Sequence, residues 1–164
     1  MAHSADYWIQ KLQLSPHPEG GYFREIYRDQ EFIPKPLGFS GKRNISTAIY
    51  YLLEKGDFSC FHQIKSDEMW HHYQGGAIHI YYIKDEKITT LKLGKNLDKG
   101  QLPMHVVPKD TWFAAEAAED NDYALVGCTV APGFDFDDFR MAKESDFSNH
   151  PLKNSPLVQR LLKK

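Results

Sequence analysis

Cysteine is scarce in this chain and long apolar runs are absent, and each absence excludes a class of protein. Two cysteines among 164 residues cannot build the disulfide framework of a small secreted domain, so we expect free thiols in a reducing compartment. No apolar stretch approaches the ~20 residues of a membrane-spanning helix, and the N-terminus has no signal-peptide pattern. We therefore expect a cytoplasmic protein with no membrane partner.

Neither sign of charge is in excess. The chain has 20 Lys and Arg against 22 Asp and Glu, and its basic residues are scattered rather than gathered in one segment. Proteins that bind nucleic acid concentrate positive charge on one face, so we expect no nucleic-acid partner. A Gly-rich phosphate loop followed by a helix is also missing, which removes a common nucleotide-binding motif.

What the chain does contain is a regular series of short strand patterns separated by turns. Short strands at such even spacing favour a sandwich or barrel over an α/β sheet. The expected strands cover residues 22–27, 45–53, 58–64, 68–74, 77–83, 87–93, 104–107, 111–115 and 123–130. No internal repeat or linker divides the chain, so we expect one mainly β domain over residues 1–164, with its barrel core at about residues 20–135.

Two short helices are expected to flank the β structure. Ser4 is placed to cap a helix over residues 4–14, because serine at this position accepts a hydrogen bond from the first helical turn. A last helix is expected to begin at Ser155 and to run toward Leu162. Residues 116–120 fit either a helical turn or a loop, and the sequence leaves both open.

The densest cluster of chemically active side chains lies between Gly56 and Gly76. It contains His62, Glu68, His71 and His72. Imidazole nitrogen and carboxylate oxygen bind borderline divalent metals, and they also exchange protons near neutral pH. The segment therefore marks a functional site, without indicating which chemistry the site performs.

Alternation along the two strands of this segment determines which side chains converge. Side chains two residues apart share a face, so Glu68 and His72 point the same way. If both inner faces look into one core, they join His62 in a set of two histidines and one carboxylate. Such a set suits iron, manganese, nickel or zinc. A β-bulge would turn His71 inward instead, and the sequence leaves this choice open.

Further side chains are expected to line the same cavity, because their predicted strands would turn them inward. Aromatic rings there would stack on a sugar or a base, and a guanidinium would pair with an anionic ligand. The candidates are Tyr22, Arg24, Tyr50, Cys60, Trp70 and Trp112. The alternative is core packing for each aromatic residue and an ordinary ion pair for Arg24.

Two stretches resemble the motifs of the cupin superfamily. Four residues stand at the spacing of the first cupin motif: Gly56, His62, Glu68 and Gly75. Ile64 occupies the place of a second motif histidine. The second motif, Pro-x-Gly-x-x-His, aligns with residues 108–113, where Asp110 replaces the glycine and Phe113 replaces the histidine. Only two of the usual metal ligands are therefore in place.

More specifically, the chain resembles the cupin-5 family, long catalogued as DUF985. The matching segments are residues 17–25, 46–53, 66–71, 107–108 with Trp112, and 130–136. The resemblance implies a double-stranded β-helix barrel of the jelly-roll kind, a ligand cavity inside it, and commonly a homodimer. It does not imply a particular reaction.

The expected function is therefore that of a small-molecule-binding cupin, which we interpret as an enzyme acting on a sugar or a small organic acid. Without a metal, His62 would be a general base and Glu68 or a tyrosine the acid in an isomerisation or epimerisation. Sugar-nucleotide 3,5-epimerases, which are metal-free cupins, offer a fold-level analogy. With a metal, the same pair would hold a Lewis acid. The alternative is a non-catalytic ligand-binding or storage-type cupin.

Overall fold

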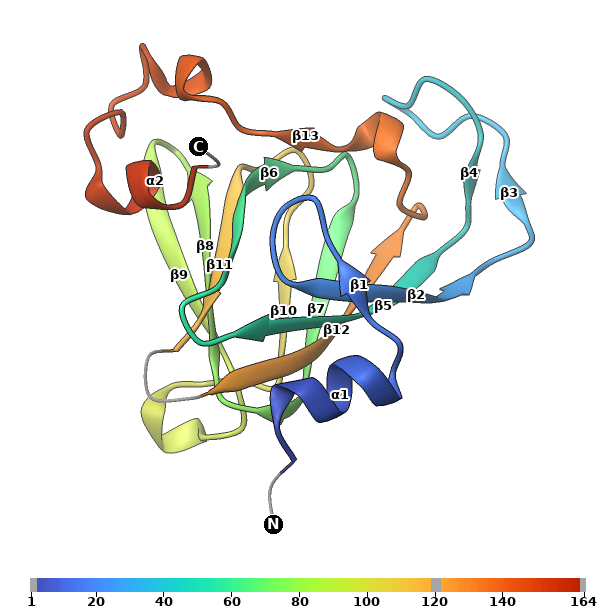
Figure 1. Ribbon diagram of the computed structural model, residues 1–164. Coiled ribbons are helices and arrows are strands. Elements are labelled where there is room, and N and C mark those ends of the chain that lie inside the picture. The colour runs from blue at the N-terminus through green and yellow to red at the C-terminus, as the bar shows by residue number, and fades with distance from the viewer. Residues whose placement is uncertain (1–2, 119–121, 163–164) are drawn as a thin grey trace.

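Two antiparallel β-sheets packed face to face form the body of the molecule (Figure 1). The computed structural model describes residues 3–118 and 122–162. In spatial order, the larger sheet contains β1 (Ser15–Pro16), β2 (Tyr22–Arg28), β5 (Thr47–Glu54), β12 (Tyr123–Ala131), β7 (Asp67–Gly75) and β10 (Met104–Val107). The smaller sheet contains β13 (Arg140–Met141), β6 (Phe58–Gln63), β11 (Phe113–Ala117), β8 (Ile78–Lys84) and β9 (Lys87–Leu93).

The chain passes back and forth between these sheets. From β5 to β8, and again from β9 to β13, each strand lies in the opposite sheet from the strand before it. This alternation is the jelly-roll arrangement of a double-stranded β-helix, so the predicted mainly β fold class is confirmed. Over the described residues, the sheets pack on each other without closing into one hydrogen-bonded barrel. A separate ribbon of β3 (Phe32–Ile33) and β4 (Arg43–Asn44) projects to one side (Figure 1).

The bounds of the longer strands coincide with those of the predicted segments to within two residues. Within the described part of the chain, the sequence missed β1, β3, β4 and β13 and the short 3-10 helices Leu97–Lys99, Phe136–Asp138 and Glu144–Phe147. A two-residue strand has no alternation to recognise, which explains the first group. Part of the undecided segment 116–120 belongs to the end of β11, and the remainder reaches beyond the described residues.

Helix α1 (Ala5–Lys11) covers part of the outer face of the larger sheet (Figure 1). Its cap is the predicted one, because the Ser4 hydroxyl accepts a hydrogen bond from the Tyr7 N–H at 3.3 Å. The Trp8 indole donates a hydrogen bond to the Tyr123 hydroxyl at 2.8 Å. The helix is therefore fastened to β12 by a polar contact as well as by apolar packing.

Replacing Ser4 by alanine is expected to lower the free energy of unfolding by about 0.5–1 kcal/mol, because without the Ser4 hydroxyl the Tyr7 N–H loses its hydrogen-bond acceptor. Urea unfolding followed by tryptophan fluorescence measures the change. Ser4→Asp is the matched control, since its carboxylate keeps the cap and is expected to leave stability unchanged. Equal losses in both variants would contradict a capping role.

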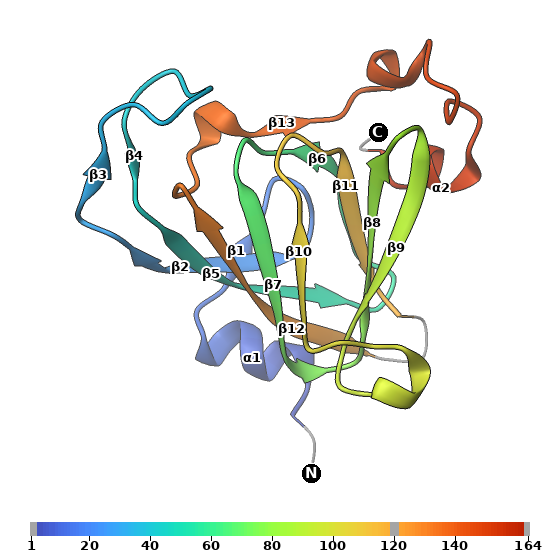
Figure 2. The ribbon, with the colours of Figure 1, turned by 180° about the vertical axis from the view of Figure 1, so that it is seen from behind.

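Helix α2 (Pro156–Arg160) lies at the far end of the smaller sheet (Figure 2). Ser155 caps it, as predicted, by accepting a hydrogen bond from the Val158 N–H at 3.5 Å. Val158 and Leu161 are fully buried against the outer side of β6, together with Phe61. Neither described helix is long or apolar enough to cross a membrane.

The space between the sheets is filled at one end and hollow at the other. Trp70, Tyr51 and Phe113 are almost fully buried, and the Trp70 ring meets the other two edge-on at centroid distances of 5.7 and 6.4 Å. Large rings packed in this way leave little free volume on their side of the core. The ligand-sized space is therefore confined to the other end, beside residues 134–139.

Candidate functional site

A cavity of about 240 Å³ lies between the sheets. Strands of both sheets and the segment 134–139 form its wall. Seven of its lining residues carry a carboxyl, imidazole or guanidinium group: His17, Glu19, Glu25, Arg28, His62, Glu68 and Asp135. The two motif residues His62 and Glu68 thus reach the same cavity from different sheets, which is the juxtaposition that the sequence predicts.

His62 reaches the cavity through a β-bulge in β6. On β11 two positions separate Phe113 from Ala115, whereas their partners on β6, His62 and Ser59, are three positions apart. The extra residue breaks the alternation of β6. Cys60, expected on the same face as His62, does not line the cavity. The predicted position of Cys60 in the cavity wall is wrong, because alternation of side chains holds only in a regular strand.

The hydrogen bonds of His62 fix the orientation of its ring. Its Nδ1 lies 2.7 Å from the Cys60 carbonyl oxygen, which only accepts, so Nδ1 carries a hydrogen and donates it. Nε2 therefore faces Glu19, whose Oε2 is 3.2 Å away. Burial lowers the pKa of His62, and the opposing influences of the Glu68 charge and the Cys60 carbonyl are smaller.

Glu19 comes from the turn before β2, and two glycines allow it to approach. Gly20 has a φ of +116°, and a Cβ at this position would lie 2.1 Å from the Phe58 carbonyl oxygen. The Cys60 N–H donates to the Glu19 carbonyl at 2.8 Å, and the Tyr51 hydroxyl donates to the Gly20 carbonyl at 2.7 Å. A larger side chain at Gly20 would thus push Glu19 away from β6.

The Glu19 carboxyl group is buried, with 7% of the residue exposed, and burial raises its pKa. His17 and the hydroxyls of Ser59 and Tyr51 oppose this shift more weakly. Burial also shifts the pKa of His17, which it lowers. The Nδ1 atom of His17 lies 3.6 Å from Glu19 Oε2. Neither His17 nor Glu19 was among the site residues predicted from the sequence, although the glycine pair beside them was a usable signal.

Glu68 projects inward from β7, where it pairs with Val130 of β12. Burial raises the pKa of Glu68 to about 7, and the nearby Glu19 contributes in the same direction. His62, the Trp70 indole and the Cys128 thiol lower that pKa, but by less. At neutral pH, Glu68 therefore exists in both protonation states.

The other two predicted metal ligands lie elsewhere. His72 shares the inward face of β7 with Glu68, but it stands near the opposite end of the strand and lines a separate recess beside Lys95. Its Nε2 is bonded to the Gly76 carbonyl at 2.7 Å. His71 lies on the outer face, with Nε2 3.3 Å from the Thr129 hydroxyl. Neither residue lines the cavity that contains His62.

Three predicted ligand-binding residues also point away from the cavity. Phe23 lines it, so its neighbours on β2, Tyr22 and Arg24, face outward. The Arg24 guanidinium donates to the Leu12 carbonyl at 3.1 Å. Tyr50 packs with Tyr22 against α1 on the same outer face.

Trp112 and Trp70 complete the list of candidates. Trp112 packs outside the smaller sheet, 5.0 Å from the Arg140 guanidinium, because Phe113 takes the inward position instead. Trp70 does point between the sheets, as predicted, but it belongs to the filled part of the core. Cys128 of β12 lines the cavity next to Glu68 and was not selected from the sequence.

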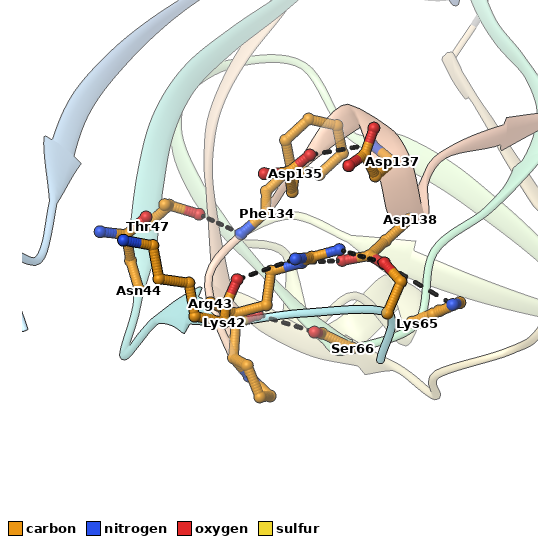
Figure 3. A network of polar contacts seen from close by, with 12 residues as sticks. Lys42, Arg43, Asn44, Thr47, Lys65, Ser66, Phe134, Asp135, Asp137 and Asp138 are labelled. Carbon is orange, nitrogen blue, oxygen red and sulfur yellow. Dashed lines mark hydrogen bonds and ion pairs between the residues drawn. The ribbon is translucent and has the colours of Figure 1, made fainter. Parts of the chain in front are cut away.

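The segment 132–139 closes one side of the cavity and is held by hydrogen bonds at several points (Figure 3). The Phe134 N–H donates to the Thr47 hydroxyl at 2.9 Å. The Ser66 hydroxyl donates to the Pro132 carbonyl at 2.7 Å. These bonds fix the start of the segment to β5 and to the turn before β7.

A buried ion pair holds the other end of this segment (Figure 3). Arg43 of β4 donates from Nε and Nη2 to the two carboxylate oxygens of Asp138, at 2.6 and 2.9 Å. Only 6% of Arg43 and 8% of Asp138 are exposed. The exposed Lys65 ammonium lies 3.8 Å from the same carboxylate. A bidentate pair of this kind fixes direction as well as distance, so it positions the cavity wall.

The donor set does not fit the divalent metal that the cupin motifs imply. Ile64 and Phe113 fill the places of two motif histidines, and neither side chain binds a metal. His62 Nε2 is directed at Glu19. Over the described residues, no three His, Cys, Asp or Glu side chains converge as a metal-binding group.

Comparison with known proteins identifies relatives over nearly the whole chain. The model of the family described as Cupin superfamily (DUF985) matches residues 6–142. The uncharacterized protein YML079W of Saccharomyces cerevisiae is 32% identical over 155 residues, which cover 87% of this chain and 77% of that protein.

Solved structures also match this chain over nearly its whole length. Protein SO0799 from Shewanella oneidensis is 36% identical, with a TM-score of 0.86 and 99% of each chain covered. A hypothetical protein from Leishmania major is 28% identical, with a TM-score of 0.90, covering 99% of this chain and 100% of that one. None of these three descriptions states an activity, so function has to be argued from the cavity.

Proposed function

The chain belongs to the DUF985 family of the cupin superfamily, and we propose that it is an enzyme that moves protons on a small metabolite bound in its cavity. The observation that carries this proposal is the cluster of two carboxyl groups and two imidazoles buried around one space. Burying such groups is costly, and strongly shifted pKa values in a cavity are typical of catalytic sites.

Glu68 is suited to be the base. Because its pKa is raised to about 7, a substantial fraction is ionised at neutral pH while its basicity stays high. A catalytic group works best when its pKa lies near the working pH. Glu68 also faces the open cavity, where a ligand would lie.

The pair of Glu19 and His62 is suited to be the acid. Burial raises the pKa of Glu19 and lowers that of His62. Because His62 Nδ1 donates to the Cys60 carbonyl, the approach of Nε2 to within 3.2 Å of Glu19 Oε2 requires one proton between these two atoms. That proton is available to a ligand oxygen in the cavity. These roles differ from the sequence-based interpretation, in which His62 was the base and Glu68 or a tyrosine the acid.

Solvent-proton exchange tests the proposal. A mixture of enolisable aldehydes, ketones and sugars is incubated with the protein in D₂O, and mass spectrometry detects deuterium at carbon. We expect the wild type to catalyse incorporation into a member of the mixture. Replacing His62 by glutamine is expected to slow this exchange about a hundredfold, because the shared proton is lost.

His71→Gln is the matched control, since this histidine lies on the outer face and is expected to leave exchange unchanged. Thermal unfolding verifies that both variants fold. Undiminished exchange in His62→Gln would contradict the proposal. A compound that binds without exchanging would favour the alternative function, a non-catalytic ligand-binding cupin. The expected homodimer and cytoplasmic location stay predictions.

A further inference from the structure

The cavity has a polar part and a hydrocarbon part. Beyond the proton-exchanging groups, its wall is formed largely by apolar side chains: Phe23, Ile49, Ile64, Val130, Phe134 and Phe139. The Thr47 hydroxyl on this wall already accepts a hydrogen bond from the Phe134 N–H at 2.9 Å. A hydroxyl group placed against such a wall loses its hydrogen bonds to water and gains none, which costs free energy. A sugar, with hydroxyls on every side, therefore fits this wall poorly.

The cavity also offers no unpaired guanidinium to an anionic ligand. Arg28 is the single Arg or Lys among the described lining residues. Its guanidinium donates twice to the Glu25 carboxylate, at 2.7 and 2.9 Å, once to the Asn44 side chain at 2.8 Å and once to the Phe134 carbonyl at 3.1 Å. These bonds occupy the fork that would otherwise hold a carboxylate or phosphate.

Carboxyl groups outnumber the single guanidinium at this site. Glu19, Glu25, Glu68 and Asp135 all line the cavity. Burial holds His17 and His62 toward their neutral forms, so they supply little positive charge. An anion entering here would lose hydration and meet the ionised fraction of Glu68 and the Asp135 carboxylate, and the one guanidinium is already bonded to Glu25. The organic acid expected from the sequence is therefore disfavoured as well.

Size sets a further limit on the ligand. The cavity volume of about 240 Å³ lies below the ~300–1,000 Å³ of sites for drug-sized molecules. Phe136 stands at the rim with 55% of its surface exposed, so the opening itself is also aromatic. A single compact ring or a short hydrocarbon chain, with a polar group at one end, matches this space.

Building on the proposed function, we infer that the ligand is an uncharged carbonyl compound with an apolar body, which is enolised at the junction of the polar and hydrocarbon parts of the cavity. The apolar body would pack against Phe23, Phe134 and Phe139, and the carbonyl group would face Glu68 and the Glu19–His62 pair. Two features narrow the ligand class beyond the proposed function: four of the five N–H groups of Arg28 are bonded to other residues, and the wall is largely apolar.

The proton transfers balance without a further reactant. The carbon–hydrogen bond next to the carbonyl breaks, its proton goes to the Glu68 carboxylate, and its electron pair forms the carbon–carbon double bond. The carbonyl π pair moves to oxygen, which takes the proton of the Glu19–His62 pair and gives an enol. Return of the Glu68 proton to the same carbon, and of the oxygen proton to the Glu19–His62 pair, regenerates the ketone; exchange of the Glu68 proton with D₂O before its return labels that carbon.

Three probes test this ligand class: phenylacetone, phenylpyruvate and dihydroxyacetone. Phenylacetone has the charge and body that we infer, phenylpyruvate adds a carboxylate, and dihydroxyacetone lacks an apolar body. Calorimetric titration gives the dissociation constants, and mass spectrometry in D₂O gives the exchange. We expect phenylacetone to bind at least tenfold more tightly than the other two and to exchange deuterium.

Asp135→Asn is a variant that separates charge from shape. Asparagine keeps the oxygen that accepts the Asp137 N–H at 2.9 Å, so the segment is expected to stay folded. We expect this variant to bind phenylpyruvate a few-fold more tightly than the wild type and phenylacetone equally. Unchanged phenylpyruvate affinity would contradict the charge argument.

The remaining outcomes distinguish the two proposals. Exchange of dihydroxyacetone or phenylpyruvate without preference for phenylacetone would overturn the ligand class and keep the acid–base enzyme. Tight binding of phenylacetone without exchange would keep the ligand class and overturn the enzyme. Binding of none of the three probes would overturn the inferred class.

Discussion

Asparagine in place of Asp138 is expected to lower the free energy of unfolding by about 3 kcal/mol, the lower end of the cost of breaking a buried ion pair. The variant leaves the Arg43 guanidinium buried without its carboxylate, and an unpaired buried charge is far more costly than the pair is favourable. We expect the lower end of this energy range because the exposed Lys65 ammonium lies only 3.8 Å from the Asp138 carboxylate. Solvent is therefore close to the ion pair. Urea unfolding measures the change.

Asp137→Asn is the matched control, since this neighbouring carboxylate is exposed and is expected to change stability by less than about 0.5 kcal/mol. Replacing the pair together, Arg43→Met with Asp138→Leu, is expected to recover most of the loss because no charge remains buried. Equal stability of Asp138→Asn and Asp137→Asn would show that the pair does not hold the segment.

We expect the effect of Glu68→Gln on stability to depend on pH. The free energy of unfolding of the variant, measured relative to the wild type, is expected to be higher at pH 8 than at pH 5 by on the order of 3 kcal/mol. In the native protein the pKa of Glu68 is raised from an ordinary value of 4.5 to about 7. Between these two values, the unfolded chain releases the proton while the native protein retains it. The stability contributed by the protonated form is thus complete below pH 4.5 and is lost as the pH rises through 7.

Glutamine cannot ionise, so Glu68→Gln is expected to escape this loss. The measurement is the difference in urea-unfolding free energy between variant and wild type, at pH 5 and again at pH 8. Glu144→Gln, at an exposed position, controls for the removal of one negative charge. A difference between Glu68→Gln and wild type that does not change with pH would show that Glu68 titrates normally in the native protein.

Strand positions were predictable because alternation and turn residues are local properties of the sequence. The strands β9 and β10 have the bounds that the sequence predicts, and most others differ by one or two residues. The inward positions of His62 and Glu68 were also predictable, because Ile64 follows one and Trp70 the other at a spacing of two residues, and both of these apolar residues point between the sheets.

Inward and outward faces were harder to assign where both sides of a sheet are covered. The larger sheet packs against α1 on its outer side, and the smaller sheet packs against the segment that ends in α2. Aromatic residues therefore occur on both faces, and a shift of one position exchanges them. Tyr22, Tyr50 and Trp112 were placed inside for this reason.

The positions of the Glu19 and Cys60 side chains depend on contacts between segments that are far apart in the sequence. Glu19 enters the cavity because Gly20 lets the backbone of the turn approach Phe58 closely. Cys60 leaves the expected face because β6 bulges opposite β11. Both features are set by how one strand or turn meets another, and alternation within a strand does not encode them.

The position of Glu19 between α1 and β2 has a practical consequence for handling the protein. A fusion partner or affinity tag attached ahead of α1 is joined to the cavity by a short length of chain, since His17 and Glu19 follow closely after Lys11. At the other terminus, α2 packs on the far sheet, and no described residue beyond Phe139 lines the cavity. Tags for ligand-binding measurements therefore belong at the C-terminus.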